Sequence, residues 1–138
     1  MKLNLFLRVL TLGVSLATTG AAQDATNGRN LFGTFCSQCH GYGARGDGPK
    51  AKSLEKSPAN LTLLSAGNGG LFPTARAAYR IDGREYVAAH GGSMPFYGDI
   101  MGAPFVTIET PDGPLEVGQA IADLLVFLQA IQQDAPGS

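Results

Sequence analysis

The positions of apolar side chains predict two amphipathic helices, one near each end of the chain. In residues 25–40 the apolar positions fall on one face of a helix, at Leu31, Phe32, Phe35 and Cys39. Asp24, Thr26 or Asn27 can cap the start of this helix, because their side-chain oxygens accept hydrogen bonds from free backbone amides. Near the C-terminus, apolar residues recur at every third or fourth position and predict a second helix, with Val117, Ile121, Leu124, Leu128 and Ile131 on its stripe.

Between these helices, loops rich in glycine and proline alternate with short helical stretches. Residues 41–49 contain four glycines and a proline and are predicted to form a loop. Four short elements are expected to follow in this order: one or two helical turns at 50–56, a turn at 67–70, a helix from Pro73 to Ile81 and a further short helix from Arg84 to Ala89.

A small β-hairpin is predicted at residues 105–117. Apolar and polar side chains alternate there on both sides of a turn at Pro111–Gly113. The preceding residues, 93–105, show no period and are expected to form a loop. Because helices dominate, the expected fold class is all-α, a bundle of short helices to which the hairpin is the one exception.

The first 22 residues are predicted to be a secretory signal peptide. Lys2 and Arg8 give a basic start, an apolar run follows at 9–17, and small residues lead to a cleavage site after Ala22. The apolar run is shorter than the roughly 20 residues that span a bilayer, which disfavours an uncleaved membrane anchor. We therefore expect one mature domain, residues 23–138, in the periplasm or an equivalent oxidising space.

The composition limits the classes of function that the protein can have. The 138 residues include 19 Gly, 8 Pro and two Cys, so one domain with a small core is expected, and a bound cofactor would help to stabilise it. The formal net charge is −1 and becomes −3 when Lys2 and Arg8 leave with the signal peptide. This charge gives no basic footprint for nucleic acid and is too weak to select an acidic or a basic partner.

The residues with distinctive chemistry are concentrated at Cys36-Ser37-Gln38-Cys39-His40. This C-x-x-C-H spacing is the attachment signature of c-type haem. Residues three apart on a helix share a face, so both thiols can reach the two vinyl groups on one porphyrin edge. His40 follows directly, and its imidazole can ligate the iron. The sequence therefore predicts one haem c, attached covalently through Cys36 and Cys39.

Other uses of two cysteines fit the sequence less well. A thioredoxin-like redox pair usually accompanies a βαβ pattern, and the chain has no convincing parallel strand. A zinc site needs about four ligands, and the chain offers only Cys36, Cys39, His40 and the distant His90 as soft ligands. A plain disulfide or a redox pair remains the alternative to haem attachment.

Several stretches around this motif carry a family resemblance. Gly28-x-x-Leu31-Phe32 precedes the motif, and CHG, GDGP and PANLT occur at 39–41, 46–49 and 58–62. Leu124-x-x-Phe127-Leu128 lies in the last predicted helix. From about Asn27 to Ile131 the chain resembles the small class I c-type cytochromes of bacteria. The resemblance implies a cytochrome c-like bundle around one haem, whose first and last helices cross where Gly28 or a neighbour meets Phe127.

The resemblance also implies a methionine as the second axial ligand, commonly in a Met-Pro pair. Met94-Pro95 matches that pattern and lies in the loop before the hairpin. Met101 lacks the proline and is expected to be core filler. His90 could instead give an iron with two histidine ligands, but it lies near the end of a predicted helix, which disfavours this role. An open sixth position is the remaining alternative. His40 and Met94 are therefore the expected iron ligands.

The surroundings of the haem follow from the same resemblance. A ligating imidazole donates its other N–H to an acceptor, and in the family a loop proline's carbonyl accepts it, which makes Pro49 the expected partner of His40. For most residues of this kind, a solvated position on the surface is more common than a contact with a cofactor. The side chains available as donors to the haem propionates are Arg45, Arg76, Tyr79, Arg80, Arg84 and Tyr97.

These inferences lead to an expected function. An iron with both axial positions filled by protein has no open site for a substrate, so we expect a one-electron carrier rather than an enzyme. A haem-based sensor or a peroxidase-like protein with a labile sixth ligand is the alternative. The expected partners are redox proteins that bind transiently, with no nucleic acid and no stable membrane insertion. The protein is expected to be a monomer, unless it is the cytochrome subunit of a periplasmic dehydrogenase or respiratory complex.

Overall fold

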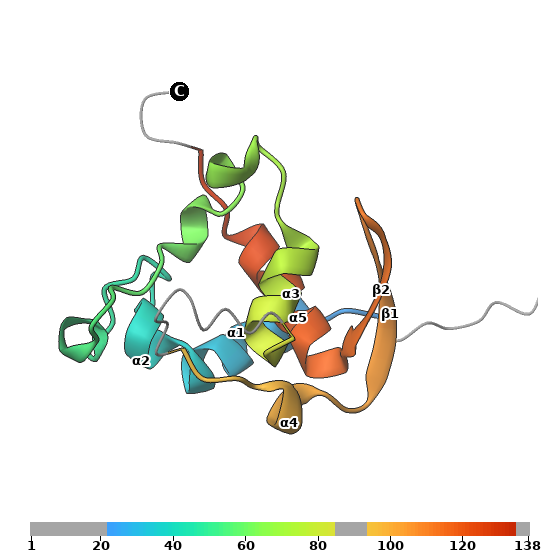
Figure 1. The fold of residues 1–138 in the computed structure, drawn as a ribbon, viewed down its shortest axis with the longest axis horizontal. Helices are drawn as coiled ribbons and strands as arrows, with labels where there is room; N and C mark the ends of the chain where they lie inside the picture. The colour runs from blue at the N-terminus through green and yellow to red at the C-terminus, as the bar shows by residue number, and fades with distance from the viewer. Residues whose placement is uncertain (1–21, 85–93, 135–138) are drawn as a thin grey trace, which may run out of the picture.

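The computed structural model describes residues 22–84 and 94–134, which form α-helices and one two-stranded antiparallel sheet (Figure 1). The helices are α1 (Ala25–Phe35), α2 (Ser37–His40), α3 (Thr74–Asp82), α4 (Gly98–Met101) and α5 (Gln119–Ala130). The strands β1 (Phe105–Thr110) and β2 (Gly113–Gly118) lie between α4 and α5 in the sequence. The fold is therefore helical with one small sheet, and the hairpin predicted at residues 105–117 is confirmed.

The helix predicted at 25–40 forms in two pieces that meet at Cys36. Asp24 caps its start, where its side chain accepts from the amides of Thr26 and Asn27. At the junction, the Cys39 amide donates to the carbonyl oxygen of Cys36 at 3.2 Å, one residue short of the α-helical partner. This tighter turn separates α1 from α2 and places Cys36 at the break, with Cys39 in α2.

Helices α1 and α5 cross at Gly28, as the family resemblance implies. A Cβ atom at Gly28 would lie 2.0 Å from the carbonyl oxygen of Asp123 and 2.9 Å from Cβ of Phe127, so the close approach requires glycine. Beside the crossing, the rings of Phe32 and Phe127 pack with their centroids 5.3 Å apart. The buried Asp123 side chain accepts at 2.7 Å from the side chain of Asn27 and so ties α5 to the start of α1.

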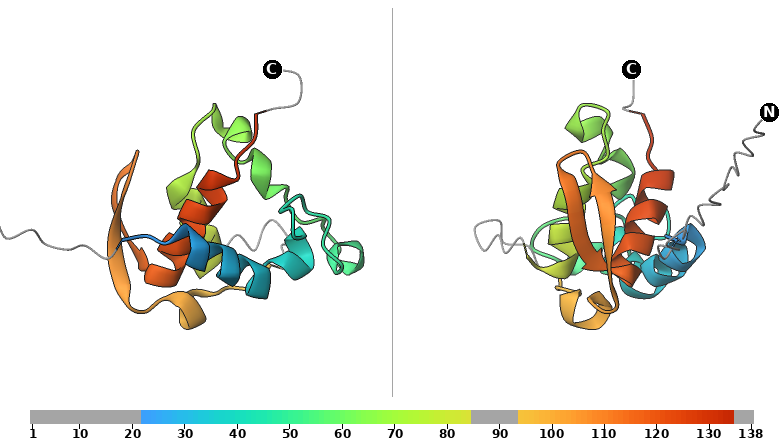
Figure 2. Two further views of the ribbon diagram at one scale, coloured as in Figure 1. Left: turned by 180° about the vertical axis from the view of Figure 1, so that it is seen from behind. Right: turned by 90° about the vertical axis from the view of Figure 1, so that its right-hand side faces the viewer.

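Helix α5 is the centre of the core. Its buried side chains are Ile121, Ala122, Asp123, Leu124, Leu125, Phe127 and Leu128. Helix α3 contributes Ala78 and Ile81 to the same core, and the hairpin contributes Ile108, Leu115 and Val117. The hairpin and the loop at 41–56 lie at opposite ends of the molecule (Figure 2). Val117 was expected both in the hairpin and on the stripe of the last helix, and the structure pairs it with Val106 in the sheet.

The segment between α2 and α3 has little regular structure but is held firmly. Its three 3₁₀ turns are Ala51–Ser53, Leu61–Leu63 and Ala66–Asn68, of which the first lies within the turns predicted at 50–56 and the last overlaps the turn predicted at 67–70. Gln132, just beyond α5, donates to the carbonyl oxygen of Leu61 and accepts from the amide of Ser65, each at 2.8 Å. The end of the last helix therefore fixes the segment that passes His40.

Helices α3 and α4 lie on either side of residues 85–93, which the structure does not describe. The helix predicted from Pro73 to Ile81 is confirmed as α3, whereas α4 falls in a stretch that was expected to be a loop. Residues 85–89 of the next predicted helix, His90 and all of the predicted signal peptide except Ala22 lie outside the described residues. Within residues 22–84 and 94–134, no helix has the length and apolar character needed to cross a membrane.

Candidate functional site

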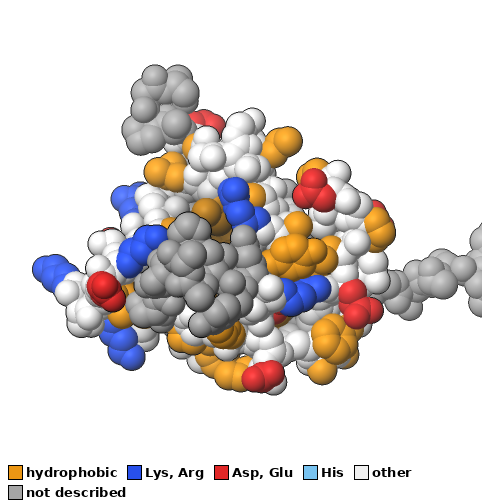
Figure 3. Space-filling view, in the orientation of Figure 1, with side chains coloured by type: hydrophobic (Ala, Val, Ile, Leu, Met, Phe, Trp, Pro, Cys, Tyr) orange, Lys and Arg blue, Asp and Glu red, His pale blue; other side chains and the backbone are white. Residues whose placement is uncertain are grey.

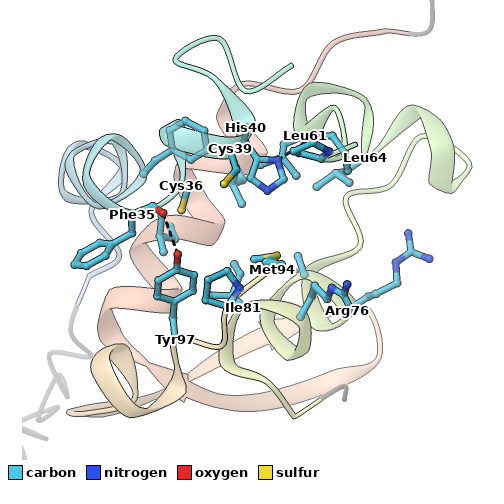
Figure 4. A pocket seen from close by; sticks show the side chains of 18 of the residues that line it. Phe35, Cys36, Cys39, His40, Leu61, Leu64, Arg76, Ile81, Met94 and Tyr97 are labelled. Atoms are coloured by element: carbon cyan, nitrogen blue, oxygen red, sulfur yellow. Dashed lines mark hydrogen bonds between the residues drawn. The ribbon is translucent and has the colours of Figure 1, made fainter. Parts of the chain in front are cut away.

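A cavity of about 580 Å³ lies between the helices and the long loop segments (Figure 4). Its walls come from α1, α2, α3 and α5, from the segment at 54–64 and from residues 94–97. Most of the lining is apolar and includes Phe32, Phe35, Leu54, Leu61, Leu64, Ile81, Leu124 and Leu128. A cavity of this volume and lining suits a small organic ligand or a cofactor.

Cys36, Cys39 and His40 lie together on one wall of this cavity (Figure 4). Both thiols are free and half-buried, so the two cysteines do not form a disulfide in this structure. His40 is 9% exposed, which leaves little of its ring open to bulk solvent. The C-x-x-C-H motif therefore presents three potential bonding groups to one space, as the sequence predicts.

The imidazole of His40 is held by the backbone of Ala59. Nδ1 of His40 lies 3.0 Å from the carbonyl oxygen of Ala59, and the expectation that Pro49 supplies this acceptor is wrong. The segment around Pro49 pairs with α2 instead, since the amides of Gly48 and Lys50 donate to carbonyl oxygens of that helix. With Nδ1 as the donor, Nε2 is the unprotonated nitrogen, and it has no hydrogen-bond partner in the described part of the chain.

Burial controls the protonation of the groups on this wall. It lowers the pKa of His40 from its ordinary value of 6.5, while the bond to Ala59 acts in the opposite direction. The imidazole is therefore neutral at pH 7, which leaves a lone pair on Nε2. Burial, and secondly the neighbouring Cys39, raises the pKa of Cys36 to about 11. Redox-active cysteines have lowered pKa values, so the electrostatics of Cys36 are opposite to those of a thioredoxin-like pair.

Met94 lies across the cavity from His40 (Figure 4) and lines it together with Pro95. Met101 lies elsewhere: it is 2% exposed, packs in the hydrophobic core and is absent from the cavity lining, which agrees with its expected role as core filler. His90 lies outside the described residues. Of the two methionine candidates, the structure brings only Met94 into the same cavity as Cys36, Cys39 and His40.

Among the described residues, the cationic side chains of Lys56, Arg76 and Arg80 line the cavity. Arg76 and Arg80 occupy successive turns of α3, and positions four apart on a helix lie on the same face. Tyr97 also lines the cavity. Arg76, Arg80 and Tyr97 are three of the six side chains that were expected as donors to the haem propionates.

The other three expected donors do not line the cavity. The guanidinium of Arg84 donates to the carbonyl oxygen of Glu116 at 2.9 Å, and its central carbon lies 4.9 Å from the ring centroid of Tyr79. These contacts place Arg84 against the hairpin and Tyr79 against Arg84. Arg45 is exposed on the loop after α2.

Sequence reasoning missed two contributors to the site. Ala59 acts through its carbonyl oxygen, a group that every residue has, so no side-chain pattern marks it. Lys56 stands in a short stretch that also carries Lys50 and Lys52, and its type alone does not distinguish it from them. Only the path of the segment at 54–64 along the cavity identifies both residues.

Comparisons of this chain with protein-family models, with curated proteins and with solved structures found no match. The described residues contain no group of three or more His, Cys, Asp and Glu side chains placed to hold a metal ion. The site is therefore defined by its own geometry: two free thiols, an imidazole and a thioether around one largely apolar cavity.

Proposed function

We propose that the protein is a one-electron carrier whose cavity holds a single c-type haem, with His40 and Met94 as iron ligands and Cys36 and Cys39 as attachment points. The observation that carries this proposal is that these four side chains line one cavity, with Met94 across from His40 (Figure 4). When bound, the haem would supply an iron that is oxidised and reduced by one electron.

The residues present fit this cofactor. The thiols of Cys36 and Cys39 are free and lie on the same wall, as attachment to one porphyrin edge requires. A neutral imidazole and a thioether are the ligand pair that raises the reduction potential of a haem iron. The apolar lining suits the porphyrin ring, and the guanidinium groups of Arg76 and Arg80 suit its carboxylates.

The chain would act mainly by holding these ligands. The carbonyl oxygen of Ala59 fixes the ring of His40 and makes its Nε2 a better donor. His40 and Met94 would hold the iron between them and leave no place on it for a substrate, so we infer no catalytic activity. The crossing of α1 and α5 at Gly28 supports a cytochrome c-like arrangement of the helices, with the hairpin as an addition.

The proposed function includes export of the protein to the periplasm. Helix α1 begins at Ala25, and its cap Asp24 follows closely after the expected cleavage site at Ala22. Removal of the signal peptide would therefore leave the first helix complete. We propose that residues 23–138 form the mature domain in the periplasm, as a monomeric carrier or as the cytochrome subunit of a dehydrogenase or respiratory complex.

The surface charges support a transient partner with an acidic docking site. Residues 41–80 contain six Lys and Arg against two Asp and Glu. The described residues from 82 to 134 contain one Arg against seven Asp and Glu, of which only Asp123 is buried. On the face shown in Figure 3, most Lys and Arg side chains lie on the side of the 41–56 loop, whereas most Asp and Glu side chains lie toward the hairpin. The weak net charge of −3 therefore conceals a strong separation of charge, which would orient an approaching redox protein.

Carbon monoxide binding tests this function against its main alternative. The reduced holoprotein is expected to bind carbon monoxide slowly and incompletely at neutral pH, because Met94 would occupy the sixth position. Rapid and complete binding would contradict the proposed ligation and favour a sensor or a peroxidase-like protein. Covalent haem that survives denaturing electrophoresis would separate both from a thiol oxidoreductase.

A further inference from the structure

Tyr97 connects the segment that carries Met94 to two helices at once. Its amide donates to the carbonyl oxygen of Ile81, near the end of α3, at 2.8 Å. Its hydroxyl donates to the carbonyl oxygen of Phe35, the last residue of α1, at 2.9 Å (Figure 4). Tyr97 therefore links α3, the Met94 segment and the helix that leads into Cys36.

The break at Cys36 is what makes the carbonyl of Phe35 available. In a regular α-helix this oxygen would accept from the amide of Cys39, but that amide donates to Cys36 instead. The carbonyl oxygen of Phe35 accepts from the hydroxyl of Tyr97 in place of the Cys39 amide. The link therefore depends on the same local distortion that separates α1 from α2.

The ring of Tyr97 reinforces the hydrogen bond. It packs edge-on against the ring of Phe35, with centroids 5.9 Å apart and an interplanar angle of 67°. Burial, followed by the neighbouring cysteines, raises the pKa of Tyr97, so its hydroxyl remains a donor throughout the neutral range. Both contacts therefore hold the residue in one place at the edge of the cavity.

The distance along the chain makes this link relevant to Met94. Residues 94–97 lie outside helices and strands, and three residues of extended chain span at most about 11 Å. The position of Tyr97 therefore limits where Met94 can lie. We propose that Tyr97 is a positioning residue, which keeps the side chain of Met94 facing into the cavity opposite His40 by bonding its segment to Phe35. This role rests on the proposed function, because it presumes that Met94 is an iron ligand.

The test is Tyr97→Phe in the holoprotein, with Tyr79→Phe as the matched control. Tyr97→Phe removes the bond to Phe35 but keeps the ring, whereas the hydroxyl of Tyr79 has no hydrogen bond among the described residues and lies outside the cavity lining. In Tyr97→Phe, we expect carbon monoxide to bind the reduced protein about fivefold to tenfold faster, which corresponds to the loss of one hydrogen bond. We also expect weaker methionine-to-iron charge-transfer absorption and a lower reduction potential. Tyr79→Phe should leave all three unchanged.

The outcomes separate this role from the function on which it rests. Unchanged binding rate, absorption and potential in Tyr97→Phe, with slow carbon monoxide binding in the wild type, would overturn the role of Tyr97 alone. Equal changes in Tyr79→Phe would also overturn it. A wild-type protein that binds carbon monoxide rapidly, or that carries no covalent haem, would overturn the proposed function and this role together. Hydrogen exchange gives a readout that does not depend on the haem. The backbone amide of residue 97 should exchange faster in Tyr97→Phe than in Tyr79→Phe.

Discussion

Nδ1 of His40 lies 3.0 Å from the carbonyl oxygen of Ala59, 19 residues further along the chain. The segment that provides this oxygen is held from two directions. The amide of Leu61 donates to the carbonyl oxygen of Ala44 at 2.7 Å, and Gly46 packs closely against Pro58. The orientation of the imidazole therefore depends on how the two loop segments after α2 fit together.

Gly46→Ala should disturb this fit. Gly46 has a φ of +83°, and a Cβ atom there would lie 2.3 Å from the carbonyl oxygen of Pro58. We expect the free energy of unfolding to fall by about 1–3 kcal/mol, as measured by denaturant titration. A displaced Ala59 carbonyl would make His40 a weaker donor to iron, so the reduction potential should rise. Gly43→Ala is the control, because its nearest neighbour would be the side chain of Arg45 at 3.8 Å. Wild-type stability and potential in Gly46→Ala would contradict this role for the segment.

Met94→Ala should remove the methionine-ligated spectrum and lower the reduction potential, because it deletes the thioether on the cavity wall. Met101→Leu is the matched control for this variant. Met101 is buried in the core away from the cavity, and a volume-conserving change there should cost less than about 1.5 kcal/mol and leave the spectrum unchanged. Visible absorption and a redox titration would measure both. If Met94→Ala kept its methionine spectrum, another residue would be the ligand.

Gly28→Ala and Gly33→Ala should have opposite effects on stability, although both glycines lie in α1. At Gly28 the added Cβ would approach the carbonyl oxygen of Asp123 to 2.0 Å, so the helices must separate, at a cost of about 1–3 kcal/mol. At Gly33 nothing lies within 4 Å of the added atom, and the better helix propensity of alanine should stabilise the fold by about 0.5–1 kcal/mol. Thermal or denaturant unfolding of the two holoproteins would compare them. Equal effects would mean that α1 and α5 do not cross at Gly28.

Replacing Lys50 and Lys52 by glutamine should slow the oxidation of the reduced protein by an anionic complex such as hexacyanoferrate(III). Both lysines are exposed on the loop side of the molecule, where they would attract an anion. We expect a reduction of about twofold or more at low ionic strength, which disappears as added salt screens the charges. Glu109→Gln on the hairpin is the control and should change this rate little. A larger effect from Glu109→Gln would place the electron-transfer surface at the hairpin.

The elements that the sequence predicted best were those with a clear period or a clear turn. The apolar period through Ile121, Leu124 and Leu128 predicted α5, and all three side chains are buried in the core. Alternation around Pro111–Gly113 predicted the hairpin. Val117 fitted both the hairpin and the stripe of the last helix, and its pairing with Val106 places it in the hairpin.

The candidate site was predictable where it depends on side-chain type. Spacing alone brought Cys36, Cys39 and His40 together, and the resemblance added Met94, which lines the same cavity. The acceptor for His40 was not predictable, because Ala59 contributes a backbone oxygen whose position depends on the path of the 54–64 segment. The uneven distribution of charge along the chain is visible in the sequence, but its separation in space is not, because it depends on the 41–56 loop and the hairpin lying at opposite ends of the molecule.

The most direct test of the central claim is the mass of the purified, denatured protein. We expect the mass of residues 23–138 plus one haem, because two thioether bonds at Cys36 and Cys39 would survive denaturation. Cys36→Ala combined with Cys39→Ala should give the same chain without covalent haem. A wild-type mass equal to that of the bare chain, or one lighter by two hydrogens from a Cys36–Cys39 disulfide, would contradict the proposal.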